Sequence, residues 1–208
     1  MVLADAKVLI DVLKAADEWL QQVVQRAKRR RDRAAAQVLH DAFVVVAAMR
    51  AYDNAFRPLL GQLLTFSVEW SPDQRRRLSE ELNAFFDIEQ VLPPFRQALR
   101  GLESASWDGA GAEPVERVMA AATTFSEEIA GSIRLEKENY VSRRAISDAL
   151  LYGRSHEDEA TVRQWAETLV QTLDRPLLAG ADNAFGRVRQ EILAAHDLPD
   201  PGFAVALS

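Results

Sequence analysis

The sequence predicts an all-α protein, an elongated bundle of six to eight helices. Three observations predict this class. Residues 1–57 contain neither glycine nor proline, the two residues that interrupt helices most strongly. Apolar residues recur at alternating spacings of three and four along most of the chain, as in amphipathic helices. No strand pattern is present, and 208 residues, 48% of them hydrophobic, are enough to bury a sizeable core.

The first 57 residues favour a helical hairpin over one continuous rod. An apolar stripe runs from Leu9 to Ala27, blurs across the basic run 28–33 and resumes at Ala34. A rod of 57 residues would be about 85 Å long and would need a partner to cover it. Because the apolar phase is poorly kept across the arginines, we expect a turn near them, with Asp32 as the N-cap of the second helix.

The second helix contains the longest apolar run, residues 42–49. This run is far shorter than the ~20 residues that span a bilayer, so we expect a buried helical stretch and no transmembrane segment. Pro58 is expected to kink or divide the helix, because proline lacks a backbone donor and its ring clashes with the preceding turn.

A start signal for the next helix lies at residues 71–73, where serine can cap, proline suits the first turn and aspartate complements the helix dipole. The arginines at 75–77 are expected to face solvent. Pro93 and Pro94 end this helix, and residues 95–102 form one short turn more. The predicted buried residues of the helix that starts at 71–73 are Leu78, Leu82, Phe85 and Phe86.

Residues 104–113 are rich in small and turn-forming residues and are the clearest linker in the chain. They separate an N-terminal helical half, residues 1–103, from a C-terminal helical half, residues 114–198. A short frayed tail, residues 199–208, follows.

The C-terminal half is predicted to hold three helices. A long helix opens at Pro114 and runs to Leu150. The next is capped by Ser155 or Asp158 and ends before Pro176, and the last spans residues 185–193. Shifting the chain by 87 residues aligns several positions of the two halves, which suggests two related helical hairpin units. The aligned pairs are Leu63-Leu64 with Leu150-Leu151, Ser71 with Asp158, Leu78 with Trp165, Leu82 with Leu169, Phe86 with Leu173 and Asp87 with Asp174.

The absence of cysteine excludes disulfides, cysteine-ligated metal sites and thiol nucleophiles. No basic segment followed by an apolar core opens the sequence, so we expect a cytoplasmic protein. The net charge is −6, yet residues 1–57 carry ten Lys and Arg against seven Asp and Glu. A nucleic-acid footprint over the whole chain is therefore excluded, while a local basic site stays open.

The histidines give no catalytic signature. The dipeptides His40-Asp41 and His196-Asp197 resemble the His-Asp pair of metal-dependent phosphohydrolases of the HD type, in which the pair binds a metal that activates water. That family needs an earlier histidine, and none precedes His40. We expect His40 on a helix surface, His156 in a loop and His196 at a helix C-terminus, with no metal and no cofactor. No phosphate-binding loop or nucleophile elbow is present, which favours a non-enzymatic protein.

The tripeptide Trp107-Asp108-Gly109 resembles the Trp-x-Gly turn of the small helical-hairpin proteins exported by type VII secretion. The match covers three residues. The Tyr-x-x-x-Asp/Glu export signal of those proteins is missing, because Tyr152 has His156 at the fourth place. The same tripeptide is expected in any glycine-rich helix connection where an indole packs over the turn.

Three functions stay open, of which we favour the first. It is a helical interaction or scaffold protein that self-associates or binds a helical partner through an apolar stripe on the N-terminal helix. The contact stripe comprises Leu9, Val12, Trp19, Leu20 and Val23.

The second function is a polyanion-binding module for nucleic acid or anionic lipid. Its basic residues are Arg26, Lys28, Arg29, Arg30, Arg31 and Arg33. The third is a helical sensor or enzyme with a pocket between the two halves. The aromatics proposed to line that pocket are Tyr52, Phe56, Tyr140 and Tyr152.

Overall fold

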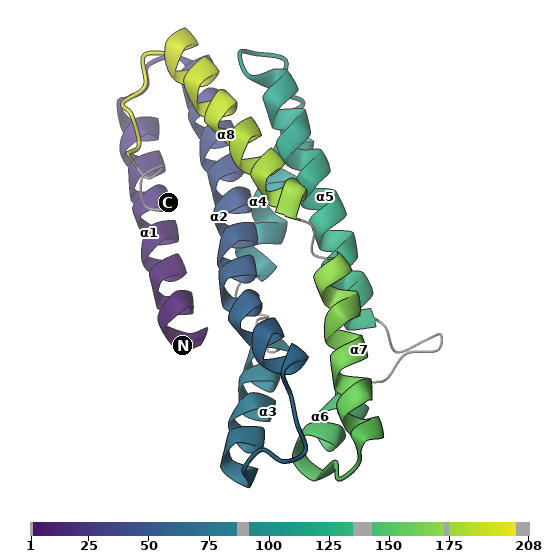
Figure 1. The fold of residues 1–208 in the computed structure, drawn as a ribbon. Helices are drawn as coiled ribbons and strands as arrows, with labels where there is room; N and C mark the ends of the chain where they lie inside the picture. Colours follow the sequence, from purple (N-terminus) through teal and green to yellow (C-terminus); the bar gives the residue numbers. More distant parts are fainter. Residues whose placement is uncertain (1, 87–91, 135–142, 173–174, 203–208) are drawn as a thin grey trace. The chain divides into compact units, whose positions relative to one another are not determined.

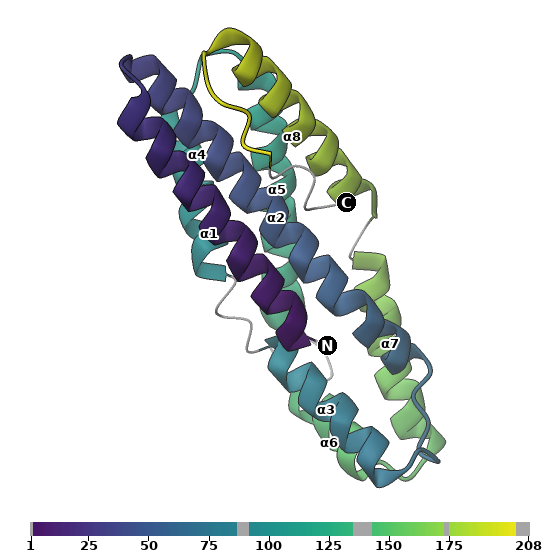
Figure 2. The same ribbon diagram turned by 90° about the vertical axis from the view of Figure 1, so that its left-hand side faces the viewer.

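The computed structural model describes residues 2–86, 92–134, 143–172 and 175–202. Within these ranges the chain forms eight α-helices and no strand (Figures 1 and 2). The predicted all-α multi-helix bundle is confirmed. The helices are α1 (Val2–Arg26), α2 (Arg30–Leu64), α3 (Pro72–Phe86), α4 (Leu92–Ala105), α5 (Ala112–Arg134), α6 (Arg143–Tyr152), α7 (His156–Thr172) and α8 (Arg175–Ala195).

The helices form two compact units, and each unit takes helices from both sides of the linker at 104–113. Unit 1 consists of α3, α6, α7 and the second parts of α2 and α5, which begin at Asp53 and Phe125. Unit 2 consists of α1, α4, α8 and the first parts of α2 and α5. The two units therefore differ from the two halves predicted from the sequence, because each unit contains helices from before and after the linker. In addition, α2 and α5 each contribute to both units.

The beginning of the chain is a helical hairpin, as favoured from the sequence. Residues 27–29 separate α1 from α2, which excludes a single rod. Asp32 is not the N-cap, because α2 begins two residues before it. Its carboxylate instead lies 2.9 Å from Nδ1 of His196. The turn is closed by Arg33, whose Nε donates to the Ala27 carbonyl at 3.0 Å, next to the C-terminal end of α1.

The first part of α2 is the core of unit 2. Every residue from Val38 to Met49 is buried, which confirms the buried stretch predicted over residues 42–49. A helix buried on all sides needs neighbours on all sides. α8 is one of them, since the rings of Phe43 and Phe185 lie 5.8 Å apart. α1 and α4 are two others, through the polar contacts described below.

α2 is the one helix, within the described ranges, that is long and apolar enough to cross a membrane. Its most apolar window is 78% buried inside the protein, as is usual for a core helix. The helix continues through Pro58, whose side chain is exposed, so proline does not divide it.

A charged cluster lies inside this apolar core. His40 and Asp41 are 8% and 6% exposed, so the expectation of a surface histidine is wrong. The His40 ring places Nδ1 3.0 Å from Asp41 Oδ1 and Nε2 2.9 Å from Asp17 Oδ1 of α1. Both ring nitrogens face carboxylate oxygens, an arrangement that favours the doubly protonated imidazolium. Burial disfavours that charge, but the hydrogen bonds and charges of the two aspartates outweigh it and raise the pKa of His40.

α4 closes the cluster from another side. It reaches Asp41 with a glycine, Gly101, and a Cβ built there would overlap Asp41 Oδ2. The helix is longer than the short turn predicted, and it begins at Leu92 so that Pro93 and Pro94 occupy its first turn, where no backbone donor is needed. Phe95, Ala98 and Leu102 form its buried face.

The linker between α4 and α5 folds as a compact turn around Trp107. Its Nε1 donates to the Ala110 carbonyl at 2.9 Å, and its indole lies so close to Gly109 that a Cβ there would collide with the ring. Gly111 follows with a φ of 80°, a conformation that favours glycine. The indole therefore packs over the turn, as expected for any glycine-rich helix connection.

Unit 1 has helix caps where the sequence predicts them. At the start of α3, Ser71 Oγ accepts from the Gln74 N–H at 3.3 Å, and Gln74 Oε1 accepts from the Ser71 N–H at 3.0 Å. Ser155 caps α7 in the same way, reciprocated by Asp158. The two capping serines are 84 residues apart, so the 87-residue alignment does not superpose the caps. The duplication stays a prediction.

The face of α3 behind this cap is only partly as predicted. Leu78 and Leu82 are buried, whereas the side chains of Phe85 and Phe86 lie outside the described residues. The middle of the long helix predicted from Pro114 also lies outside them, and its ends are α5 and α6.

We expect Gly101→Ala to lower the free energy of unfolding by about 1–3 kcal/mol, because the new Cβ would collide with the buried Asp41 carboxylate. The matched control is Gly186→Ala in α8. No atom lies within 4 Å of a Cβ at that position, and alanine improves helix propensity there by roughly 0.5–1 kcal/mol. Urea unfolding followed by circular dichroism measures both variants, and equal stabilities would contradict the close packing of α4 on Asp41.

Candidate functional site

The basic run surrounds the turn between α1 and α2 in unit 2. All six of its cations are exposed, and among the described residues none has a carboxylate within ion-pair distance. Five of them also make no side-chain hydrogen bond within the described residues, namely Arg26, Lys28, Arg29, Arg30 and Arg31. The sixth, Arg33, donates to the Ala27 carbonyl. The described acidic residues of the C-terminal half therefore do not pair with these cations.

A groove of about 840 Å³ opens beside this turn. One wall is the end of α1 and the turn itself, which contribute the cations Arg26, Lys28 and Arg29. The opposite wall is the segment after α8, where Leu198 and Pro199 lie. The volume is within the range of small-molecule sites, roughly 300–1,000 Å³.

The segment after α8 is held on the hairpin rather than frayed. Trp19 Nε1 donates to the Pro199 carbonyl at 3.1 Å. Nη2 of Arg189 donates to both carboxylate oxygens of Asp200, at 2.6 and 2.7 Å. These contacts correct the prediction of a loose tail as far as residue 202. The remaining residues, 203–208, lie outside the described part of the structure.

Three aspartates also line the groove, but two of them are engaged. Asp32 contacts His196, and Asp200 is paired with Arg189. The pKa of Asp200 is lowered mainly by the hydrogen bond from Arg189. Asp197 is exposed. The groove therefore has a cationic side with three unpaired charges and an acidic side whose charges are mostly neutralised.

The contact stripe predicted on the first helix is largely used inside unit 2. Trp19 and Val23 are 9% and 3% exposed, so the expectation of an open apolar stripe is wrong for both. Val12 and Leu20 are half-buried, and the side chain of Leu9 lies outside the described part of the structure. A helical period identifies the apolar face but not the neighbour that covers it.

The aromatic pocket predicted for a sensor or enzyme is not assembled from the residues that were proposed. Tyr52 and Phe56 are buried, at 7% and 2% exposure, and burial raises the pKa of the Tyr52 hydroxyl. Tyr152 is 72% exposed, so it cannot line a buried pocket. Tyr140 lies outside the described residues.

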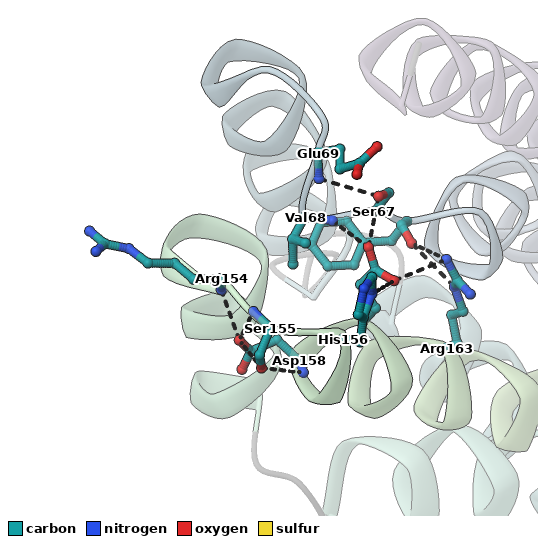
Figure 3. Close-up of polar contacts among 10 residues, drawn as sticks. Ser67, Val68, Glu69, Arg154, Ser155, His156, Asp158 and Arg163 are labelled. Carbon is teal, nitrogen blue, oxygen red and sulfur yellow. Dashed lines mark hydrogen bonds and ion pairs between the residues drawn. The ribbon is translucent and has the colours of Figure 1, made fainter.

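A second polar cluster lies in unit 1, around Glu159 in the first turn of α7 (Figure 3). One carboxylate oxygen, Oε1, accepts from Ser67 Oγ at 2.7 Å and from the Val68 N–H at 2.8 Å. The other, Oε2, lies 3.2 Å from His156 Nδ1 and 3.6 Å from Arg163 Nη2. These partners, above all the Ser67 and Val68 donors, lower the pKa of Glu159 to about 2.

The cluster around Glu159 is a clamp, by which we mean a set of contacts that holds the α2–α3 loop against α7. Ser67 and His156 both contact the glutamate, whereas a nucleophilic triad needs a histidine between the serine and the carboxylate. The His156 side chain is 91% exposed. Arg163 continues the clamp with two hydrogen bonds to the Phe66 carbonyl, at 3.2 and 2.9 Å. The α2–α3 loop is thus fastened to α7.

Arg75 does the same for the end of α6. Its Nε donates to the Leu150 carbonyl and its Nη2 to the Gly153 carbonyl, both at 2.7 Å. The guanidinium also lies 5.9 Å from the centre of the Phe66 ring. The prediction that Arg75 faces solvent is wrong, whereas Arg76 and Arg77 are exposed. Sequence reasoning missed this role because the two acceptors on α6 and just after it, the Leu150 and Gly153 carbonyls, are 75 and 78 residues away.

Within the described ranges, no group of three or more His, Asp and Glu side chains is arranged to hold a metal ion. His40 and His196 are each engaged with aspartates. No protein-family model matches this chain, and comparisons with characterised proteins and with solved structures give no match.

We expect Glu159→Gln to make the protein less stable at neutral pH and less sensitive to acid. The folded pKa, about 2, is below the ordinary value of 4.5, so the carboxylate adds stability above pH 4.5 and loses it as the pH falls towards 2. The stability gap between wild type and variant should therefore close over that range. Glu157→Gln, an exposed neighbour in the same turn, is the control. Thermal unfolding at several pH values measures the gap, and a gap independent of pH would contradict the clamp.

Proposed function

We propose that this protein is a polyanion-binding module and that the turn between α1 and α2 binds the phosphates of a nucleic acid. The observation that carries the proposal is the set of five exposed cations without a carboxylate partner in the described structure. Clustered like charges repel one another and destabilise a fold. A polyanion relieves that repulsion, and the release of its counterions drives binding.

Two further features support this site. The N-terminal end of α2 lies in the basic run, and its dipole and free backbone N–H groups favour anions. Among the residues whose side chains the structure describes, the large apolar ones that are exposed belong to unit 1, away from the basic run in the sequence, and are Leu151, Tyr152 and Val170. Binding to a membrane surface usually combines basic residues with exposed apolar ones, so the composition of the turn favours nucleic acid over lipid.

We expect a variant with Lys28, Arg29, Arg30 and Arg31 changed to Ser to lose at least about tenfold in affinity for a single-stranded oligonucleotide. The slope of log affinity against log salt should fall by roughly 3, since about 0.7 counterion is released for each phosphate contact. The control is the double variant Arg76→Ser/Arg77→Ser, which removes exposed arginines from α3.

Fluorescence anisotropy at several salt concentrations measures both quantities. Equal affinity of the fourfold variant and the wild type would remove the proposal. Binding to anionic vesicles in the absence of oligonucleotide binding would also overturn it, in favour of a lipid surface.

Self-association through α1 is the second candidate. It is supported by the half-buried apolar residues that follow the helix beside its buried face, Val12, Leu13, Leu20 and Val24. If these residues form a dimer interface, Leu20→Gln/Val24→Gln should convert a dimer into a monomer. Light scattering coupled to size exclusion measures the mass, with Gln21→Ala/Gln25→Ala on the exposed side of α1 as the control. A wild-type protein that is monomeric at every concentration contradicts this candidate.

A further inference from the structure

The groove beside the basic run combines positively charged side chains with apolar ones. Arg30 and Arg31, which lie outside the groove, offer only exposed charge. Arg26, Lys28 and Arg29 line the groove, whereas Arg30 and Arg31 do not. An extended polyanion would use all five cations. A ligand held in the groove would use only the first three.

The apolar part of the groove comes from both walls. Trp19, Val23 and Ala27 contribute from the hairpin, and Leu198 and Pro199 contribute from the segment after α8. Trp19 and Val23 are almost buried, so the accessible apolar surface is mainly that of Ala27 and Leu198, which are half-buried, and Pro199, which is exposed. Gln22 and His196 add polar groups between these walls.

The charge distribution limits the size of the ligand. The whole chain has a net charge of −6, so a long polyanion meets repulsion once it leaves the basic run. Asp197 on the far wall also repels an anion that extends across the groove. A compact ligand with its charge at one end and an uncharged, partly apolar group at the other fits both constraints.

We propose that the groove binds a nucleoside polyphosphate, with the phosphates on Arg26, Lys28 and Arg29 and the nucleoside against Leu198 and Pro199. This proposal rests on the proposed function, because it uses part of the same basic run. The groove volume of about 840 Å³ is in the range of small-molecule sites. Phosphate oxygens are recognised by guanidinium and ammonium groups. Apolar side chains line most small-molecule sites, and Leu198 and Pro199 provide them for the nucleoside.

Titration calorimetry with ATP tests the proposal on the full chain, in magnesium-free buffer at about 0.15 M ionic strength, where charges more than about 8 Å apart are largely screened. Arg26→Ser/Lys28→Ser/Arg29→Ser should lose at least about tenfold in ATP affinity, since charge-assisted hydrogen bonds are the strong ones. The matched control, Arg30→Ser/Arg31→Ser, removes exposed cations of the same run and should leave the affinity within about twofold. Asp197→Asn should raise it. Circular dichroism verifies that each variant is folded.

Two comparisons separate the parts of the ligand. Inorganic tripolyphosphate should bind more weakly than ATP, and Leu198→Ala should weaken ATP without changing tripolyphosphate. Equal affinity for the two ligands in wild type and Leu198→Ala would overturn the nucleoside part. Absence of ATP binding, or the same loss of affinity in the groove variant and its control, would overturn the whole inference.

The same samples distinguish this inference from the proposed function. An oligonucleotide should bind more weakly to both the groove variant and its control, because all five cations face an extended chain. Oligonucleotide binding without ATP binding overturns the groove inference and leaves the proposed function standing. ATP binding without oligonucleotide binding overturns the proposed function and supports a site limited to a compact ligand.

Discussion

The contacts of His40 with two carboxylates constrain the packing of unit 2. His40 lies in the most apolar part of α2, and its two nitrogens contact carboxylates of different helices, Asp41 of α2 and Asp17 of α1. His40 and Asp41 are buried, so removing either one would leave a polar group without its partner in the core. The Asp17 side chain is 64% exposed, and its contact with His40 joins α1 to α2 from the solvent side. α4 must then approach with a glycine to make room for Asp41. The polar cluster thus adds specificity to a core that apolar packing alone would hold less uniquely.

The candidate site follows from this arrangement of α1 and α2. Antiparallel helices joined by residues 27–29 leave a short turn, and the basic run falls on it. Within the described residues these cations have no carboxylate partner, and one of them, Arg33, donates to the Ala27 carbonyl next to the end of α1. A concentration of unneutralised charge lowers stability, and natural proteins break local rules of this kind mainly at functional sites. Contacts from Trp19 and Arg189 hold the opposite wall of the groove in place.

Arginines in unit 1 show the contrasting use of the same side chain. Arg75 and Arg163 donate hydrogen bonds to backbone carbonyls, and these bonds hold loops against helices. Glu159 completes the fastening with its own hydrogen bonds to the α2–α3 loop. No period or composition distinguishes these arginines from those at 29–31 in the sequence. The distinction depends on which carbonyls come within 3 Å, and those belong to residues far away along the chain.

Helical periodicity and caps by themselves determined the fold class, the buried stretch of α2 and the serine cap at Ser71, because these depend on residues within one or two turns of each other. The sequence favoured the hairpin over a rod and left Ser155 and Asp158 as alternative caps of α7. The sequence also identified the basic run, but not whether its cations form ion pairs with carboxylates. Only the tertiary structure placed Asp32 against His196, His40 in the core and Trp19 under Pro199, since each pairing joins residues 23 to 180 positions apart. Such contacts depend on how whole helices pack, and the amphipathic pattern of each helix carries no record of its partner.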